Sequence, residues 1–177
     1  MKPLRILVLT HIDLVPPESL EGKSEREIGT WRKEYDVCHG LRELEHEVLV
    51  LGVSHDLAPI KQHVEGFQPH AVFHLLMEFQ DVAVYQAHVT SYLELLRAPY
   101  AGCNPRGLLL ARDKVLCKQV LAYHRLPTPQ FAVFRRGRKI RLPRRLRLPL
   151  FVKSATEDAS LGISQASVVD DAQKLRE

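Results

Sequence analysis

Three short apolar runs separated by helical patterns constrain the fold of the first hundred residues most strongly. The runs are Arg5–Thr10, Glu47–Val53 and Ala71–Leu76, and each is rich in Val, Leu, Ile or Phe. Continuous apolar runs of this length are typical of strands that are buried on both faces, as in a parallel sheet. Strands that alternate with helices in this way predict a parallel α/β sheet.

Helical patterns fill the segments between these runs. Over residues 24–45, apolar side chains recur at spacings of three and four, which indicates one amphipathic helix. Ser24 is its expected N-cap, and Glu27 stands three residues further on, as in a capping box. Two shorter helices are expected over residues 58–66 and 83–97.

The pattern changes after a short strand or turn at 99–102. Residues 106–125 are predicted to form one helix, because Pro127 and Pro129 follow it and cannot continue it. Beyond them the sequence predicts strands and then the start of a helix, at 131–134, 148–153, 163–169 and from 170 onward.

Two domains are therefore expected. Residues 1–104 form a Rossmann-like α/β domain with a parallel sheet, and residues 105–177 begin a second, α+β domain. A strand–loop–strand–helix unit that stops at residue 177 cannot bury both of its faces by itself. We therefore expect the second domain to be incomplete and the chain to be the front part of a longer protein.

Composition and charge exclude several classes of protein. With 45% hydrophobic and 26% charged residues the chain can form an ordinary globular core, and a net charge of +4 does not demand nucleic acid. The cysteines are three in number and far apart, which favours free thiols over disulfides. Neither a targeting segment nor a membrane-spanning run is visible, so we expect a cytoplasmic protein.

One lysine stands out by its position. Lys153 ends an apolar run, and a stretch of small and polar residues that contains Gly162 follows it. Phosphate sites combine a cation with backbone N–H groups, and small residues let that backbone approach the ligand. The stretch is not a P-loop, because the lysine precedes the loop. Taken alone, a solvated lysine before an ordinary hairpin turn is the simpler interpretation.

The surrounding motifs change this interpretation. They are P-Y-x-G from Pro99, D-K-x-x-x-K from Asp113, L-P-T-P-x-F from Leu126, and P-L-x-V-K-x-x-x-E-x-x-S-x-G from Pro149. In this order they resemble the D-alanine–D-alanine ligase branch of the ATP-grasp superfamily, over roughly residues 66 to 177. The resemblance implies an ATP-dependent carboxylate–amine ligase that works through an acyl phosphate, with ATP and Mg²⁺ as cofactors. Residues 105–177 would then be the start of an ATP-grasp domain.

The resemblance implies a nucleotide site in the second domain. Lys114 and Lys153 match two family lysines that contact the nucleotide at its phosphates or nearby. Glu157, Ser160 and Gly162 fall on the family's flexible glycine-rich loop, which closes over the phosphates. Cations at such a site offset the charge of ATP and of the phosphoryl group in transfer. The implied catalytic residues are Lys153 and Ser160.

A substrate site in the first domain is implied as well. The stretch from Phe73 to Glu78 is similar to an F-N-L-x-x-E pattern of ligase-like relatives, with His74 where asparagine is usual. The stretch S-E-R-E-I, which begins at Ser24, resembles one whose glutamate orients the amino substrate. Glu78 and Glu25 are therefore the implied contacts to a small amino-acid-like substrate. A first-turn glutamate favoured by the helix dipole is the alternative for Glu25.

Departures from the family pattern limit what the resemblance implies. Ala159 lacks the hydroxyl that the family loop offers to substrate, and the H-G-x-x-G-E-D-G stretch is absent. The resemblance is thus stronger for the nucleotide than for the amino acid, and D-alanyl-D-alanine is not implied as the product. The family's magnesium ligands lie further along than residue 177, so we assign no metal ligand here and expect the fragment alone to be inactive. Relatives often form dimers through the first domain, which makes a homodimer possible.

A different class of function stays open. The α/β domain could be a non-catalytic binding or dimerisation module, with the basic stretch 135–147 as an anion- or RNA-binding segment. This stretch lacks interleaved aromatic residues, and a solvated hairpin or linker explains it more simply, so nucleic acid is the less favoured partner. His11 and Asp13 follow the first strand at the edge where parallel α/β proteins bind ligands, although loop polarity alone also explains them.

Overall fold

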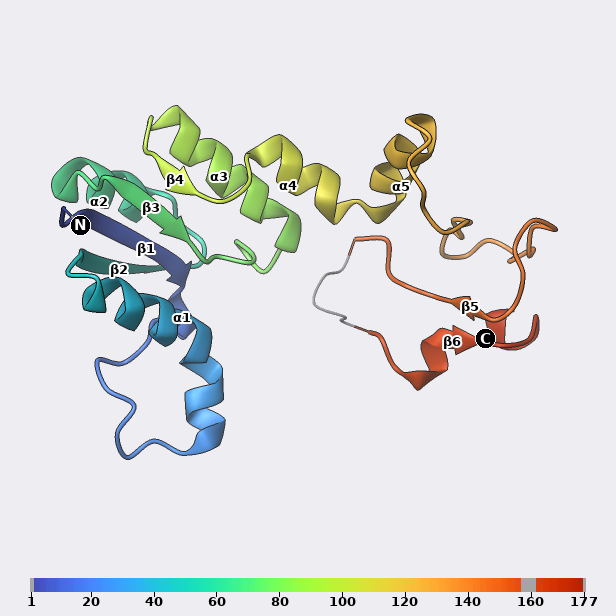
Figure 1. Ribbon diagram of the computed structural model, residues 1–177, viewed down its shortest axis with the longest axis horizontal. Coiled ribbons are helices and arrows are strands. Elements are labelled where there is room, and N and C mark those ends of the chain that lie inside the picture. Colours follow the sequence, from blue (N-terminus) through green and yellow to red (C-terminus); the bar gives the residue numbers. More distant parts are fainter. Residues whose placement is uncertain (1, 157–161, 177) are drawn as a thin grey trace. The chain divides into compact units, whose positions relative to one another are not determined.

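The computed structural model describes residues 2–156 and 162–176 and divides into two compact units, Met1–Leu108 and Leu109–Glu177 (Figure 1). The division along the chain falls inside α4 (Pro105–Arg112), whereas the sequence predicts a boundary just before this helix. The domain assignment itself stays a prediction. The elements of the first unit, in chain order, are β1 (Arg5–His11), η1 (Ile12–Leu14), α1 (Glu25–Glu43), β2 (Glu47–Val53), α2 (Ala58–Phe67), β3 (Ala71–His74), η2 (Ala83–Tyr85), α3 (Gln86–Leu95) and β4 (Tyr100–Ala101).

The first unit is built on a parallel sheet of four strands in the order β2-β1-β3-β4. Strand β1 lies in the middle, so that Leu9 is paired with Leu51 of β2 on one side and with His74 of β3 on the other. The chain leaves β1 for β2 and then crosses to β3 on the opposite side. In open α/β sheets, the carboxyl ends of two strands at such a reversal of direction mark the usual place for a ligand. The predicted α/β fold is confirmed.

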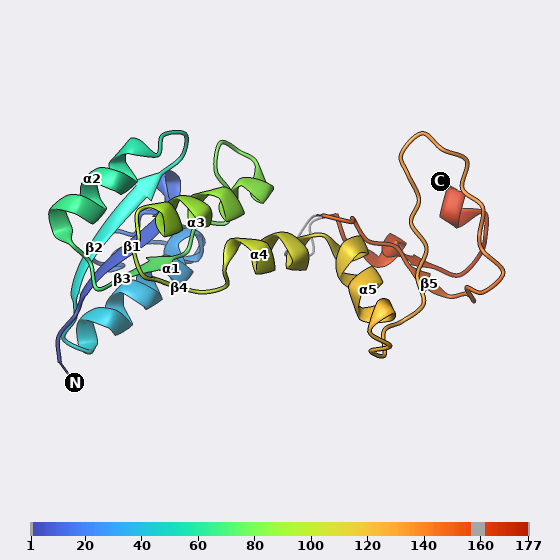
Figure 2. The same ribbon diagram turned by 90° about the horizontal axis from the view of Figure 1, so that it is seen from above.

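Helices cover both faces of this sheet (Figure 2). Helices α2 and α3 lie on one face, where Leu7, Leu9 and Val72 of the strands pack with Ile60 and Leu93 of the helices. Helix α1 lies on the other face, where its Cys38 packs with Ile6 and Val8. Alternate residues of β1 thus face opposite cores, which explains why its sequence is apolar without interruption.

The start of α1 confirms the predicted capping box. The Ser24 hydroxyl accepts a hydrogen bond from the Glu27 backbone N–H, and the Glu27 carboxylate accepts one from the Ser24 backbone N–H at 2.9 Å. These bonds to Ser24 lower the pKa of the Glu27 carboxyl group. Two of the N–H groups that a helix start leaves without partners are satisfied in this way.

Gly52 in β2 is the tightest point between the sheet and the turn that follows β1. A Cβ atom at Gly52 would lie 2.5 Å from Val15 Cγ2 and 2.9 Å from Ile12 Cα. We expect Gly52→Ala to destabilise the chain by about 1–3 kcal/mol, because the turn must shift to make room. The matched control is Gly40→Ala in α1, where the new methyl group meets no atom within 4 Å. That change is expected to stabilise by about 0.5–1 kcal/mol, since alanine favours a helix interior. Urea unfolding of both variants measures the difference, and equal effects would contradict the prediction.

The second unit departs from its predicted elements. The predicted single helix 106–125 is wrong: α4 (Pro105–Arg112) and α5 (Lys114–Tyr123) are separate helices. The reason is Asp113, whose backbone is extended and whose carboxylate accepts hydrogen bonds from the N–H groups of Val115 and Leu116 at 3.0 and 2.9 Å. An aspartate that caps a new helix in this way ends the preceding one.

The remaining strands of this unit are shorter than predicted. The pair β5 (Leu150–Phe151) and β6 (Val168–Val169) is antiparallel, η3 (Gln165–Ser167) precedes β6, and η4 (Lys174–Arg176) stands in place of the predicted final helix. The predicted strand at 131–134 is wrong, since this segment has no partner strand among the described residues. Apolar runs of four residues form strands only where a neighbouring strand accepts their hydrogen bonds.

Among the described residues, no helix is both long enough and apolar enough to cross a membrane.

Candidate functional site

Two of the predicted nucleotide-binding motifs are joined by a hydrogen bond in the second unit. Lys114 is the first residue of α5, and its backbone N–H donates to the carbonyl oxygen of Ala155 at 3.0 Å. Ala155 stands two residues after Lys153, which follows β5. Residues 39 apart in the sequence, Lys114 and Lys153, are therefore held in neighbouring segments of the same unit.

The third motif is fixed to the same helix. The Lys118 ammonium group donates to the Thr128 hydroxyl at 2.9 Å and to the Pro129 carbonyl at 3.0 Å, and it lies 5.4 Å from the ring centroid of Phe131. The second lysine of D-K-x-x-x-K thus positions the L-P-T-P-x-F segment. Lys114 and Lys118 both lie on α5, but the contacts of Lys118 give it a structural role.

Lys153 is exposed, and its ammonium nitrogen lies 5.1 Å from the centroid of the Phe151 ring. Gly162 has a left-handed backbone (φ 73°), a conformation that a side chain would make unfavourable. The other two predicted residues of this loop, Glu157 and Ser160, lie outside the described residues. The described part of the unit therefore offers a solvent-accessible cation next to a segment that the start of α5 holds in place.

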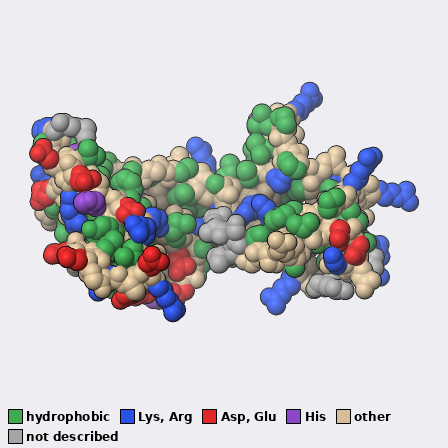
Figure 3. Space-filling view, turned by 60° about the horizontal axis from the view of Figure 1, so that its bottom comes forward, with side chains coloured by type: hydrophobic (Ala, Val, Ile, Leu, Met, Phe, Trp, Pro, Cys, Tyr) green, Lys and Arg blue, Asp and Glu red, His purple; other side chains and the backbone are tan. Residues whose placement is uncertain are grey.

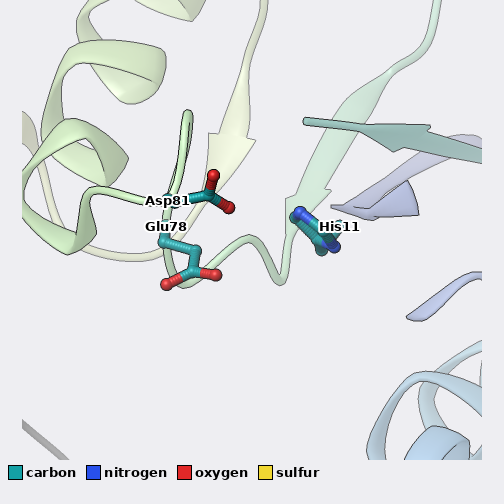
Figure 4. Close-up of side chains that lie close together, drawn as sticks. All are labelled: His11, Glu78 and Asp81. Carbon is teal, nitrogen blue, oxygen red and sulfur yellow. The ribbon is translucent and has the colours of Figure 1, made fainter. Parts of the chain in front are cut away.

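The second group of polar residues lies at the carboxyl edge of the parallel sheet (Figure 4). His11 ends β1, and Glu78 and Asp81 lie on the loop after β3. One ligand atom from each of these side chains lies within 4.8 Å of the other two. Glu78, predicted to contact substrate, is therefore part of a cluster. Glu25 is not a member of it: Glu25 is the exposed first residue of α1.

Hydrogen bonds hold the Glu78–Asp81 loop to the loop after β2. The Gln80 backbone N–H donates to the Ser54 carbonyl at 2.8 Å, and the Gln80 side-chain amide donates to the His55 carbonyl at 3.1 Å. The side chain of Phe79, which lies between Glu78 and Asp81 in the sequence, is buried in the core and anchors this loop. Gln80 and Asp81 both have left-handed backbones (φ 53° and 58°), as in a two-residue hairpin turn.

Two further side chains border this cluster. Asp13, in the turn after β1, has a carboxylate oxygen 3.6 Å from His11 Nδ1, and its backbone N–H donates to the same nitrogen. His55 Nε2 lies 3.6 Å from a carboxylate oxygen of Asp81. The Asp13 carbonyl in turn accepts a hydrogen bond from the Trp31 indole at 3.3 Å, which links the turn to α1.

His74 ends β3, one strand from His11. Its Nε2 atom is buried and has no hydrogen-bond partner, and burial lowers the pKa of the imidazole to about 4. The ring is therefore neutral at physiological pH. In the sheet His74 is paired with Leu9 of β1.

The sequence analysis missed Asp81 and His55. A usable signal was present, because both residues follow strands of a predicted parallel sheet, and the carboxyl ends of such strands share one edge. From this signal only His11 and Asp13 were predicted.

The basic stretch 135–147 contains no helix or strand. Its lysines and arginines are all exposed, and the side chain of Arg145 donates to the Phe131 carbonyl at 3.1 Å. On the face drawn in Figure 3, lysine and arginine side chains stand at separate points rather than in one continuous patch. The proposed anion- or RNA-binding role stays a prediction.

Comparisons with known proteins agree with the predicted resemblance. No protein-family model matches the chain. A D-alanine–D-alanine ligase of Syntrophotalea carbinolica is 46% identical over 89 residues, which cover 49% of this chain and 27% of that protein. One of Bordetella pertussis is 41% identical over 80 residues, covering 45% of this chain and 25% of that protein.

Solved structures give a longer match. The crystal structure of D-alanine–D-alanine ligase from Bacillus anthracis complexed with ATP matches 97% of this chain and 52% of that one, with a TM-score of 0.63 and 18% identity. This match shows the fold. Together the matches confirm the resemblance to the amino-terminal part of D-alanine–D-alanine ligases. The chain spans about half the length of the solved relative, and its matched segments span about a quarter of each curated relative.

Proposed function

We propose that this chain supplies the amino-terminal part of an ATP-dependent carboxylate–amine ligase that works through an acyl phosphate. The observation that carries the proposal is the hydrogen bond from Lys114 N to Ala155 O, which puts the two lysine motifs in neighbouring segments. The identity to ligases of two bacteria and the fold of an ATP-bound ligase support it. The free cysteines agree with a cytoplasmic location, where ATP is available.

The chemistry of such a ligase has two steps. A substrate carboxylate oxygen attacks the γ-phosphorus of ATP, the bond from that phosphorus to the β,γ-bridging oxygen breaks, and ADP leaves. The amine nitrogen then attacks the acyl carbon, the C–O bond to phosphate breaks, and the amine loses a proton. Each step places negative charge on phosphoryl oxygens, where a cation lowers the barrier.

The residues present fit the nucleotide better than they fit the metal. Exposed Lys153 offers its charge to a phosphate, and the left-handed Gly162 and the small residues Ser154 and Ala155 leave room for a phosphate near the backbone. The described residues after Leu108 contain no group of three His, Cys, Asp or Glu side chains close enough to hold an ion. We therefore propose that ATP binds partly here, and that the ligands of Mg²⁺ lie outside the described residues of this unit.

The amino-acid-like substrate is proposed to lie near Glu78, at the carboxyl edge of the sheet. Glu25, at the start of α1, stays a second proposed contact to this substrate. A homodimer through the first unit also stays a proposal.

The test uses the complete gene product that contains this chain and measures amine-dependent phosphate release from ATP. We expect Lys153→Ala to lower kcat/KM by roughly 100-fold or more, because one charge contact to a transferring phosphoryl group is lost. The matched control is Lys139→Ala, which removes an exposed lysine of the basic stretch and is expected to change little. A Lys153→Ala enzyme as active as the unmodified one would refute the assigned site.

The same preparation separates the ligase from a binding module. A gene product without ATP-dependent phosphate release, but with RNA affinity that falls steeply with salt, would favour the module. No RNA binding at physiological salt would remove the nucleic-acid alternative.

A further inference from the structure

We propose that His11, Glu78 and Asp81 form a site for a divalent transition-metal ion at the carboxyl edge of the parallel sheet. No metal ligand in this chain was expected from its sequence. The site shares Glu78 with the proposed substrate contact, whereas the nucleotide site proposed around Lys114 and Lys153 lies in the other unit. Metal binding is measured without ATP or substrate, so its failure is distinguishable from a failure of the proposed ligase.

The spacing of the three ligand atoms is close to what such an ion needs. They lie within 4.8 Å of one another. Around a tetrahedral ion with bonds of about 2.1 Å, ligand atoms stand about 3.4 Å apart. The side chains therefore need to move inward by about 1 Å, a shift that rotation about the side-chain bonds of Glu78 and Asp81 supplies, since both reach solvent. Figure 4 shows the carboxylates of Glu78 and Asp81 on the loop after β3, on the side toward His11.

The charge of the cluster favours a cation. Two carboxylates stand close together, and in the described ranges no lysine or arginine forms an ion pair with either of them. The ion pair recorded for Asp81 is with His55, which counts as charged only if the imidazole is protonated. Like charges at this distance repel, and a bound divalent ion would turn that repulsion into attraction.

The ligands come from a strand and from a loop that is held in place by its contacts. His11 is part of β1, which pairs with strands on both sides, and only 16% of its side chain is exposed. The loop with Glu78 and Asp81 is fixed by buried Phe79 and by the hydrogen bonds from Gln80 to Ser54 and His55. A site of this kind loses little conformational entropy when the ion binds.

The donor set selects the kind of metal. An imidazole nitrogen with two carboxylate oxygens suits Zn²⁺ and similar transition metals, whereas Mg²⁺ prefers oxygen alone and keeps its waters. His55, 3.6 Å from Asp81, can add a second imidazole.

Titration of the purified 177-residue chain with Zn²⁺, followed by calorimetry, tests the site. We expect one Zn²⁺ to bind per chain. In both His11→Gln and Asp81→Asn, the Zn²⁺ affinity is expected to be lower than that of the unmodified chain by about 10-fold or more. The matched controls are His39→Gln and Asp36→Asn on α1, where His39 and Glu43 form an ordinary surface pair at 3.5 Å. These variants are expected to bind like the unmodified chain.

Two further measurements on the unmodified chain test the site even if a variant folds poorly. Co²⁺ in place of Zn²⁺ is expected to give visible absorption without a thiolate charge-transfer band, because the proposed donors are nitrogen and oxygen. Zn²⁺ is also expected to raise the melting temperature of the unmodified chain but not of Asp81→Asn. The site is refuted by an absence of Zn²⁺ binding, or by a Zn²⁺ affinity of His11→Gln and Asp81→Asn equal to that of the unmodified chain. A thiolate band that assigns the ion to a cysteine, or displacement of Zn²⁺ at equimolar Mg²⁺, would also refute it.

Discussion

Leu9→Ala is expected to destabilise the first unit by about 3–4 kcal/mol. Leu9 lies in the central strand β1, is fully buried, and belongs to the larger of the two cores, the one beneath α2 and α3. Removing its isobutyl group loses the transfer free energy of the buried atoms. It also leaves a cavity that strands fixed on both sides cannot close.

The control for this change is Leu95→Ala at the end of α3, where the leucine is 80% exposed. That variant is expected to lie within about 0.5 kcal/mol of the unmodified chain. Urea unfolding followed by far-ultraviolet circular dichroism measures both. A Leu9→Ala effect no larger than that of Leu95→Ala would show that the sheet is not the core of this unit.

Lowering the pH from 7 to 4 is expected to destabilise the first unit through His74 by about 3 kcal/mol. The pKa of this imidazole is about 4 in the fold, against 6.5 for a free histidine, because burial disfavours the charged form. Between these two values the unfolded chain binds a proton that the folded chain does not. Stability therefore rises with pH across this interval. The destabilisation from His74 is absent above about pH 6.5 and approaches its full value as the pH falls to 4 and below. A difference of about 2.5 pKa units corresponds to the stated free energy.

His74→Asn isolates this effect, since asparagine does not titrate. Urea unfolding at pH 7 and pH 4.5 is expected to show a smaller loss of stability in the variant than in the unmodified chain. His39→Asn, on the exposed surface of α1, serves as the control and is expected to keep the full pH dependence. If both variants lose stability equally between the two pH values, His74 is not the group that is buried in its neutral form.

His74 is paired with Leu9 of β1 in the sheet, and its Nε2 atom is buried without a hydrogen-bond partner. A neutral imidazole tolerates that place at the cost of one unsatisfied polar atom.

Several features of the fold followed from the sequence because they depend on neighbouring residues. The strands β1 and β2 were expected from uninterrupted apolar runs that only a doubly covered sheet accommodates, and the capping box of α1 from Ser24 and Glu27 alone. The four ordered motifs indicated the resemblance to D-alanine–D-alanine ligases, which the comparisons confirm.

Other features depend on contacts between distant segments, and only the tertiary structure decided them. Asp113 divides the predicted helix because its carboxylate caps α5, a choice that periodicity cannot show. Lys114 and Ala155 meet through a backbone hydrogen bond that leaves no mark in the sequence. Asp81 joins His11 and Glu78 only because a hairpin tied to the loop after β2 turns it toward the strand ends. Local patterns determined the elements and their capping, and long-range hydrogen bonds and burial decided which polar side chains share a site.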